Sequence, residues 1–447
     1  MKLDKDVKEI LKKIENNSYK AYVVGGAVRN YYLGLEIKDY DIATNAKPYE
    51  VINIFDKVIP TGIKYGTVTL VYNEKNYEIT TFRKDFNYIN NRKPEKVIYS
   101  DNIEEDIKRR DFTINSLYCD VDGKVYDLYK GIADIKSKII KTIGNPDERF
   151  REDALRMIRA VRFMCTLNFT IEKNTKKSIK NNCPYIKNVS YERIKVEFDQ
   201  ILLSKNPGKG IRMLTETNLM KYIIPEIYEI IGFEQHNKYH DKDVYNHTIT
   251  VLENIEPKLE LRLAALLHDI SKPETFTLDE DMEGHFKGHN KKSAEKSVEI
   301  LKRLRYDNKT IENVRTLIRY HYLKDISIKE KGIKRFIRNV GRERLEDIFK
   351  LNIADIKGKS DIASMEKVNN LKKKTRLILE KNEPIHKNDL EINGNDIKDL
   401  GVEEGKLIGE ILNYLEDKVV ENPDINNKET LINIAQRYLK NRRKNEI

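Results

Sequence analysis

The chain is long and basic. Its 447 residues are more than one domain with a single hydrophobic core usually contains, so length alone suggests about three domains. Lys and Arg together number 83 against 72 Asp and Glu, and the formal net charge of +11 indicates a polyanionic partner, with nucleic acid first among the candidates. A coding bias toward Lys, Asn, Ile and Tyr would explain part of this charge, so composition alone does not decide the partner.

The cysteine content argues against a disulfide-bonded protein, and the apolar runs argue against a membrane protein. The three cysteines form no CxxC pair and cannot all be paired, which fits a reducing compartment. The longest apolar run, LRLAALL at residues 261–267, is far shorter than the roughly 20 residues that a membrane span needs. The N-terminus also lacks the apolar core of a signal peptide. We therefore expect a cytoplasmic protein with no membrane partner.

The first part of the chain alternates short apolar runs with helical patterns. In order, we expect a strand at 21–24, a helix start at 27–34, a strand at 39–44, a helix at 47–55 and a hairpin of strands at 66–72 and 76–82. Pro48 suits the first turn of its helix. These elements predict a small mixed sheet within residues 1–145.

From RFREDALRMIRAVRF onward the apolar residues recur at helical spacing, and β-type runs disappear. We expect a helical neck at 146–235. Seven of the eight histidines lie between residues 236 and 321, which marks 236–360 as a separate unit. Residues 361–447 are expected to form a helical tail that glycines interrupt. The expected fold class is α+β, with a mixed-sheet head and an elongated all-α body.

Two acids and two glycines lie close together near the N-terminus. Asp39 and Asp41 are two residues apart, so an extended backbone points both carboxylates to one face. Mg²⁺ prefers one or two carboxylates together with substrate phosphate oxygens. Gly25 and Gly26 precede a helix start and offer backbone N–H groups to an anion. A D-x-D pair alone is more often a solvated turn, but this combination indicates a metal and triphosphate site.

Four motifs in order carry a family resemblance. They are VVGGAVRNYYLG with KDYDIATNA (residues 23–46), TTFRKDFNYINNRKP (80–94), IKRRDFTINSLYCD (107–120) and RFREDALRMIRAVRF (149–163). Their arrangement resembles the DNA polymerase β-like nucleotidyltransferases, and more specifically the class II tRNA nucleotidyltransferases (CCA-adding enzymes) and related bacterial poly(A) polymerases. The resemblance covers roughly the first 220 residues and implies a polymerase β-like head, followed at 146–235 by a neck that binds RNA and nucleotide.

The resemblance also implies a role for each motif residue. Asp39 and Asp41 would bind the catalytic Mg²⁺ ions. Arg110 and Asp111 would contact ribose and phosphates, and Asp153 with Arg156 would read the base edge. The residues that would bind the nucleotide are Gly25, Gly26, Arg29, Arg110, Asp111, Asp153, Arg156 and Arg159. Those of the flexible loop are Arg83, Asp85 and Arg92.

Base reading by side chains is also physically reasonable. If the segment is one helix, Asp153 and Arg156 share a face, and a carboxylate that accepts from an exocyclic amine can act beside a guanidinium that donates to the ring. A surface ion pair is the alternative for this spacing. The family pattern GGxVRD departs here at Asn30, which leaves one contact of Arg29 in doubt. Glu78 is either a further acid near the site or a surface carboxylate at a strand end.

A second constellation resembles the HD phosphohydrolase superfamily. Its residues, of which the adjacent His-Asp pair is the most specific, are His247, His268, Asp269, His289, His321 and Asp355. Imidazole and carboxylate groups suit Mn²⁺, Ni²⁺ or related ions, and a bound metal activates water against a phosphoester. The resemblance implies a phosphohydrolase that acts on RNA ends; a helical support for RNA without activity is the alternative.

Taken together, the motifs imply template-independent addition of C, C and A to the 3′ end of tRNA from CTP and ATP, with two-metal nucleotidyl transfer. An enzyme that adds only A, or a poly(A) polymerase, is the nearest alternative. The segment 390–417 resembles the tail that contacts the tRNA elbow in this family. The sequence does not indicate an oligomeric state.

Overall fold

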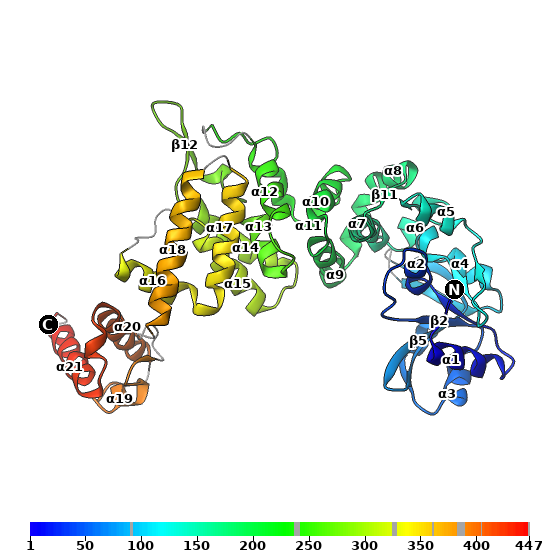
Figure 1. Ribbon diagram of the computed structural model, residues 1–447, viewed down its shortest axis with the longest axis horizontal. Helices are drawn as coiled ribbons and strands as arrows, with labels where there is room; N and C mark the ends of the chain where they lie inside the picture. The colour runs from blue at the N-terminus through cyan, green and yellow to red at the C-terminus, as the bar shows by residue number, and fades with distance from the viewer. Residues whose placement is uncertain are drawn as a thin grey trace. The chain divides into compact units, whose positions relative to one another are not determined.

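The computed structural model describes residues 1–89, 93–236, 242–323, 329–359, 362–381, 389–403 and 405–445. It divides into two compact units (Figure 1). Unit 1 comprises Met1–Tyr228 with Arg303–Tyr306, and unit 2 comprises Glu229–Lys302 with Asp307–Ile447. The division lies near the expected boundary at residue 235, and the finer division into four parts stays a prediction.

Unit 1 begins with a mixed sheet of order β3-β4-β5-β2-β1-β8-β9. Strand β2 pairs in parallel with β5, and the other neighbours are antiparallel. The strands of this sheet are β1 (Ala21–Val24), β2 (Asp41–Thr44), β3 (Val58–Gly62), β4 (Thr67–Tyr72), β5 (Lys75–Thr81), β8 (Tyr118–Cys119) and β9 (Val125–Tyr126). Val24, Ala43, Phe82, Ile107 and Tyr118 form a buried cluster at its centre. The predicted mixed-sheet head is confirmed.

The helices of unit 1 are mostly short. Those of the head are α1 (Lys5–Glu15), α2 (Gly26–Tyr32), α3 (Pro48–Ile54), α4 (Ile103–Lys108) and α5 (Gly131–Lys136). Those that follow are α6 (Pro146–Glu152), α7 (Leu155–Leu167), α8 (Lys173–Asn182), α9 (Tyr191–Leu202), α10 (Pro207–Glu216) and α11 (Met220–Ile223). Two further pairs of strands are β6 (Arg83–Ile89) with β7 (Lys93–Tyr99) and β10 (Ile139–Ile140) with β11 (Thr170–Ile171).

Local sequence explains several of these elements. Asn73 and Glu74 both have positive φ, 47° and 62°, and form the two-residue turn of the predicted β4–β5 hairpin. Both values match a type I′ turn, which fits the twist of the strands. Pro48 starts α3 as predicted, since its missing N–H has no partner at that position.

Two local predictions are wrong. Strand β2 begins at Asp41, so Asp39 precedes the strand. The segment 149–163 is not one helix, because Asp153 is extended (φ −138°, ψ 103°) and separates α6 from α7. Asp153 and Arg156 therefore do not share a helix face.

Unit 2 is mainly helical (Figure 1). Its helices are α12 (Val244–Glu253), α13 (Leu259–Leu267), α14 (His289–Arg303), α15 (Asn308–Tyr320), α16 (Glu330–Val340), α17 (Leu345–Lys357), α18 (Ile362–Glu380), α19 (Gly394–Lys398), α20 (Lys406–Glu421) and α21 (Lys428–Asn445). The expected all-α body is interrupted by a hairpin of β12 (Phe276–Leu278) and β13 (Gly284–Phe286).

The end of unit 2 has a core of its own. Apolar side chains of α19, α20 and α21 form a buried cluster with Ile411, Leu415 and Leu431 at its centre. This cluster confirms that the tail is folded and helical. No helix within the described residues is both long and apolar enough to cross a membrane.

Candidate functional sites

Unit 1 contains an open pocket of about 980 Å³. Nine Lys and Arg side chains and five Asp and Glu side chains line it, so its charge suits a polyanion. The cations are Arg29, Lys38, Arg83, Arg109, Arg110, Arg156, Arg159, Arg162 and Arg193. The acids are Glu36, Asp39, Asp41, Asp111 and Asp153. The pocket thus brings together most of the residues that the motifs predict.

Three carboxylates meet at the start of β2. Asp39 and Asp41 line the pocket while Tyr40 and Ile42 between and after them are buried, so the predicted alternation holds. Glu78 of β5 is opposite Asp41 in the parallel register. Desolvation by the pocket walls and the charge of Glu78 raise the pKa of Asp41. A divalent cation with oxygen ligands would relieve this repulsion, so these residues fit a metal.

Gly25 brings the acids and Arg110 together. Its φ of +66° and ψ of −122° place it in a conformation that other residues rarely adopt. A Cβ atom on Gly25 would lie 3.4 Å from Arg110 Nη1 and 4.0 Å from Asp41 Oδ2. The glycine therefore permits the backbone to approach both charged groups at the start of α2.

Arg29 is held by amides instead of carboxylates. Asn30 Oδ1 accepts from Arg29 Nε and Nη2 at 3.2 and 2.9 Å, and Asn115 Oδ1 accepts from Nη1 at 2.6 Å. Burial, together with Arg162 and Arg159, lowers the pKa of Arg29 to about 10 against the opposing charge of Asp111. Asn30 thus does orient Arg29, but it leaves the cation without a directly bonded anion.

Asp111 bonds two other residues of the pocket lining. Its Oδ2 accepts from Arg159 Nε and Nη2 at 3.0 and 2.6 Å, and its Oδ1 accepts from Asn115 Nδ2 and from the Phe112 N–H. Burial opposes ionisation of this carboxyl, but Arg159 and Asn115 outweigh it and lower the pKa of Asp111 to about 2. Asp111 therefore fixes Arg159 and Asn115 in the pocket.

The two predicted base-reading residues have other partners. Arg193 Nη2 donates to Asp153 Oδ2 at 2.8 Å. Arg156 Nη1 donates to Glu152 Oε2 at 2.5 Å, and its Nη2 donates to the Arg109 carbonyl at 2.7 Å. These contacts are with residues outside the surface ion pair that was the alternative for this spacing, and both side chains line the pocket.

The predicted flexible loop is only partly described. Arg83 lines the pocket and donates to the Tyr65 carbonyl. Asp85 belongs to β6, where its backbone is opposite Val97. Arg92 lies outside the described residues.

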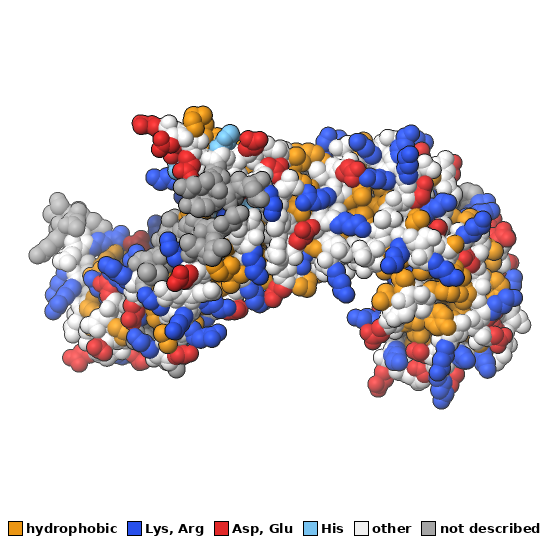
Figure 2. Space-filling view, turned by 45° about the horizontal axis from the view of Figure 1, so that its top comes forward, with side chains coloured by type: hydrophobic (Ala, Val, Ile, Leu, Met, Phe, Trp, Pro, Cys, Tyr) orange, Lys and Arg blue, Asp and Glu red, His pale blue; other side chains and the backbone are white. Residues whose placement is uncertain are grey.

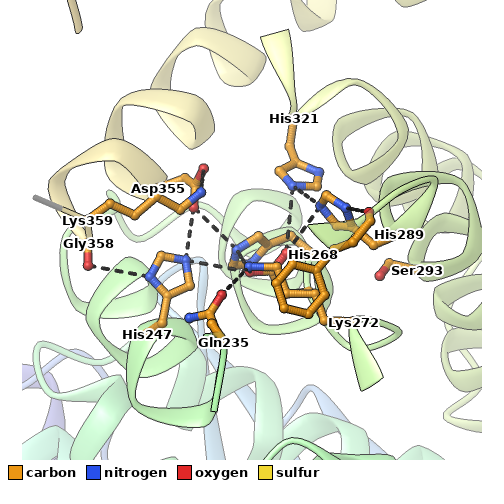
Figure 3. Close-up of polar contacts among 12 residues, drawn as sticks. Gln235, His247, His268, Lys272, His289, Ser293, His321, Asp355, Gly358 and Lys359 are labelled. Carbon is orange, nitrogen blue, oxygen red and sulfur yellow. Dashed lines mark hydrogen bonds and ion pairs between the residues drawn. The ribbon is translucent and has the colours of Figure 1, made fainter. Parts of the chain in front are cut away.

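Unit 2 brings the second set of predicted residues into one buried centre (Figure 3). All six residues are at most 8% exposed. They come from α12, from the residues that follow α13 and α15, from the start of α14 and from α17, and they are His247, His268, Asp269, His289, His321 and Asp355.

Backbone carbonyls fix which nitrogen of three histidines faces the centre. A carbonyl only accepts, so each Nδ1 that contacts one carries a proton, and in the neutral ring Nε2 then has the lone pair. The Nδ1 contacts are His268 with Ala265 (2.9 Å), His289 with Phe286 (2.7 Å) and His321 with Ile318 (2.7 Å). Such contacts commonly orient metal-binding histidines, so the donor set fits a metal.

Asp269 lies between two groups of histidines. Its Oδ2 is 3.1 Å from His268 Nε2 and 3.6 Å from His247 Nε2. Its Oδ1 is 3.5 Å from His289 Nε2 and 3.9 Å from His321 Nε2. His268 Nε2 and Asp269 Oδ2 are buried and make no hydrogen bond of good geometry, although Lys272 Nζ lies 2.7 Å from Asp269 Oδ2. Metal ions on both sides of Asp269 would satisfy these atoms.

The charges of the centre follow from its burial. Burial and neighbouring cations lower the pKa of His321 to about 3, and burial lowers that of His247 to about 4 despite Asp355. Burial disfavours the charged form of His268 as well, but Asp269 outweighs it and raises the pKa to about 9. The pKa of Asp269 is held well below its usual value by His268 and Lys272 against the effect of burial.

A buried lysine, Lys272, and a half-buried one, Lys359, border this centre. Lys272 is 3% exposed, and Lys359 has a side chain 16% exposed. Burial lowers the pKa of Lys272 more than Asp269 raises it, whereas Asp355 and Asp269 outweigh burial and raise the pKa of Lys359.

Three family models match the chain in order. The "Poly A polymerase head domain" matches residues 21–141, the "Probable RNA and SrmB- binding site of polymerase A" matches 168–230, and "tRNA nucleotidyltransferase domain 2" matches 288–435. The CCA-adding enzyme of Ligilactobacillus salivarius is 37% identical over 434 residues, which are 96% of this chain and 95% of that protein. The chain belongs to the CCA-adding enzyme family.

Other members of the CCA-adding enzyme family support this assignment. The enzyme of Limosilactobacillus reuteri is 47% identical over 213 residues, 48% of this chain and 53% of that protein. The Bacillus stearothermophilus CCA-adding enzyme in complex with CTP has a TM-score of 0.70 and 28% identity over 98% of both chains. The Thermotoga maritima enzyme complexed with tRNA_CCA, at 21% identity and a TM-score of 0.57, shares the fold.

Membership of the CCA-adding enzyme family confirms the predicted family and head fold. The HD resemblance of unit 2 stays a prediction. Sequence reasoning missed Asn115, Glu152 and Arg193, which orient the predicted arginines and Asp153. Asn115 and Glu152 stand inside two of the quoted motifs, next to the residues that were singled out. Arg193 lies on α9, far along the chain, and no local pattern indicates it.

Proposed function

We propose that this chain adds C, C and A to the 3′ end of tRNA, using CTP and ATP. The observation that carries the proposal is one pocket that is lined both by the carboxylates of Asp39 and Asp41 and by arginines. Oxygen ligands for a divalent ion and cations for a triphosphate are the two requirements of nucleotidyl transfer.

In the proposed step, the 3′-hydroxyl oxygen of tRNA forms a bond to the α-phosphorus of the nucleotide. The bond from that phosphorus to the bridging oxygen breaks, pyrophosphate leaves, and the hydroxyl proton passes to water. Asp39 and Asp41 would hold Mg²⁺, which when bound stabilises the charge on the attacking and leaving oxygens. Arg110 lies near Asp41 and Arg29 lines the same pocket, and both would hold the triphosphate in line.

Selection of the base would fall to Asp153 and Arg156. Cytosine and adenine both present an exocyclic amine, which a carboxylate accepts from, while a guanidinium donates to a ring nitrogen or oxygen. Glu152 and the Arg109 carbonyl hold Arg156, and Arg193 holds Asp153. We infer that the Arg193–Asp153 ion pair opens when a base enters, because the same carboxylate oxygens must accept from the amine.

The tRNA would be recognised mainly through its backbone. Lys173, Lys177 and Lys180 on α8 are exposed, and Figure 2 shows Lys and Arg side chains gathered on this surface of unit 1. The segment matched to an RNA-binding family model includes α8. Contacts of lysine with phosphate carry no sequence information, which suits an enzyme that serves every tRNA.

The test is incorporation onto three tRNA transcripts that end before the first C, after CC and after CCA. CTP and ATP are supplied separately and together with Mg²⁺. We expect ordered addition of C, C and A that stops at the mature end. Addition of A alone to the CC transcript would replace the proposal with an A-adding enzyme, and a long A tail would replace it with a poly(A) polymerase.

A second candidate function rests on the centre in unit 2. The inward Nε2 atoms of three histidines, fixed by their Nδ1–carbonyl contacts, and the shared Asp269 support two divalent ions such as Mn²⁺ or Ni²⁺. Bound ions would supply Lewis acidity for phosphoester hydrolysis, in which water adds to phosphorus and the ester alcohol leaves.

Hydrolysis of 2′,3′-cyclic AMP in the presence of Ni²⁺ or Mn²⁺ tests this second function. We expect His268→Gln to abolish it and Asp41→Ala to retain it. Activity that survives His268→Gln would assign hydrolysis elsewhere.

A further inference from the structure

One buried carboxylate, that of Asp106, holds two arginines of the pocket lining in unit 1. Asp106 is 0% exposed and lies in the last turn of α4, so Arg109 and Arg110, three and four residues further on, reach it. Arg109 Nη2 donates to Asp106 Oδ1 at 2.5 Å, and Arg110 Nη2 donates to Oδ2 at 3.2 Å. Burial opposes ionisation of Asp106, but the two arginines and Tyr118 outweigh it and lower its pKa to about 2. Asp106 is therefore an anion that stays charged at neutral pH.

Tyr118 of β8 completes the hold on Arg110. Arg110 Nε donates to the Tyr118 hydroxyl at 2.8 Å, and that hydroxyl donates to Asp106 Oδ2. The central guanidinium carbon of Arg110 lies 5.0 Å from the centroid of the Tyr118 ring. Tyr118 is fully buried in the cluster at the centre of the sheet, so the hold is anchored in the core of the head.

The third nitrogen of Arg110 lies near the acids of the pocket. Arg110 Nη1 and Asp41 Oδ2 both lie against Gly25, at 3.4 and 4.0 Å from where a Cβ atom of that residue would be. Burial and Glu78 raise the pKa of Asp41, and the charge of Arg110 acts in the opposite direction. A guanidinium and a carboxylate so near each other form a strong bidentate pair when nothing holds them apart. Such a pair would occupy the oxygens that a metal ion needs.

We propose that Asp106 and Tyr118 are positioning residues that keep the guanidinium of Arg110 off the carboxylate of Asp41, so that Asp41 stays open to Mg²⁺ and Arg110 to the triphosphate. The inference rests on the proposed nucleotidyl transfer and adds two residues to it, neither of which lines the pocket. Because Arg110 and Mg²⁺ would compete for the same oxygens, loss of the anion at Asp106 should raise the Mg²⁺ concentration that nucleotide binding requires.

The experiment measures binding of α,β-methylene-ATP to the full chain by equilibrium dialysis while Mg²⁺ is raised, without tRNA. This analogue carries the charge of a triphosphate but cannot transfer its nucleotide, so the readout is binding and not turnover. The complex of Mg²⁺ with the analogue in solution is the same for every variant, so differences between variants belong to the protein. In Asp106→Asn the side chain keeps its shape and loses its charge. We expect the half-saturating Mg²⁺ concentration to rise by at least about tenfold.

Two further variants show whether the effect passes through Arg110. Tyr118→Phe keeps the anion and removes one hydrogen bond, so the half-saturating Mg²⁺ concentration should rise by about twofold. This variant also keeps the test decisive if Asp106→Asn impairs folding. Asp106→Asn combined with Arg110→Gln removes the competing cation, so the Mg²⁺ requirement should return to that of the wild type. Binding of the analogue should stay weak in the double variant, because the triphosphate has lost Arg110. Damage to the fold by Asp106→Asn would not be reversed in this way.

A neighbouring pair supplies matched controls. Tyr126 of β9 is opposite Tyr118 in the antiparallel register, and its hydroxyl donates to Asp120 Oδ2 at 3.1 Å. Neither Tyr126 nor Asp120 lines the pocket. Asp120→Asn and Tyr126→Phe therefore repeat the two chemical changes at a second Tyr–Asp contact of the same sheet, and both should leave the Mg²⁺ requirement at the wild-type value.

The outcomes separate this inference from the proposed function. An unchanged Mg²⁺ requirement in Asp106→Asn and Tyr118→Phe overturns the inference alone, and so does a double variant that keeps the raised requirement. Tighter binding of the analogue to Asp106→Asn at an unchanged requirement also overturns it, since Arg110 would then have stayed in place with more of its charge available. Binding of the analogue to the wild type that does not depend on Mg²⁺ overturns the proposed metal site of the transfer reaction as well.

Discussion

The pocket of unit 1 and the centre of unit 2 assemble acids and cations in opposite ways. The pocket is open, offers only oxygen atoms to a metal, and has nine cations against five acids. The centre is buried, offers imidazole nitrogens as well, and pairs each of its two carboxylates with a lysine. A lining with more cations than acids suits a large substrate that brings several negative charges. Matched pairs suit a centre in which charge arrives with a small metal ion.

The largest expected effect separates the two sites by their oxygen ligands. Asp41→Ala removes one of the two predicted Mg²⁺ ligands, so incorporation of nucleotides should fall by at least about a thousandfold. Ni²⁺ binding by unit 2 should not change. Incorporation is measured on the CC-ending transcript, and Ni²⁺ by dialysis of the same preparation. Residual incorporation above a tenth of wild type would show that Asp41 does not hold the metal.

The reciprocal change removes a nitrogen ligand. His268→Gln keeps a polar side chain of similar size but lacks the imidazole, so Ni²⁺ affinity should fall by about a hundredfold or more. Incorporation should stay at the wild-type level, since His268 belongs to unit 2 and the pocket to unit 1. If both measurements fell together, the loss of folding would be the explanation, and circular dichroism would show it.

The two sites also differ in how far the sequence predicts them. The acid pair could be predicted because strand β2 places Asp41, the extended residues just before it place Asp39, and a glycine turn places Gly25; such local geometry follows from periodicity and glycine. The contacts of Arg156 and Asp153 could not be predicted, because the sequence analysis assumed that both residues belong to one continuous helix. The extended backbone at Asp153 interrupts it, and Arg193, forty residues further along the chain, occupies the carboxylate.

In unit 2 the sequence predicted which residues form the centre, but it did not predict that they form two groups that share Asp269. The adjacent His268 and Asp269 mark the centre, and the spacing of the other ligands agrees with separate helices. That Asp269 faces two groups of histidines depends on the packing of five helices, which no local pattern contains. Lys272 and Lys359 look like ordinary surface residues in the sequence, and only their burial shows that they balance the carboxylates.

A pH experiment sharpens the distinction between acids that bind metal and acids that support the pocket. The pKa of Asp111 is lowered to about 2 from an ordinary value of 3.8, so its ionised form stabilises the folded protein above pH 4. This contribution, about 2 kcal/mol, should be lost as the pH falls from 4 to 2. Asp41 has a raised pKa and contributes no such stability.

Asp111→Asn should therefore lower the free energy of unfolding at pH 7 by about 2 kcal/mol, and the difference from wild type should shrink between pH 4 and pH 2. Urea unfolding followed by circular dichroism measures it at each pH. Asp122→Asn, in an exposed loop, is the control and should change stability little. A difference that does not depend on pH would mean that shape rather than charge makes Asp111 important.

The smallest expected effect concerns the charge that Asn30 leaves unbalanced. Asn30→Asp would place a carboxylate against Arg29 Nε and Nη2, return the pKa of Arg29 toward its usual value and neutralise one of the pocket's cations. The KM for CTP and ATP should rise about fivefold, or about 1 kcal/mol, with little change in kcat. Asn30→Ala keeps the charge of Arg29 but not its orientation, so it should lower kcat instead. An unchanged KM for Asn30→Asp would mean that the triphosphate does not meet Arg29, and the excess of cations would then serve the tRNA backbone rather than the nucleotide.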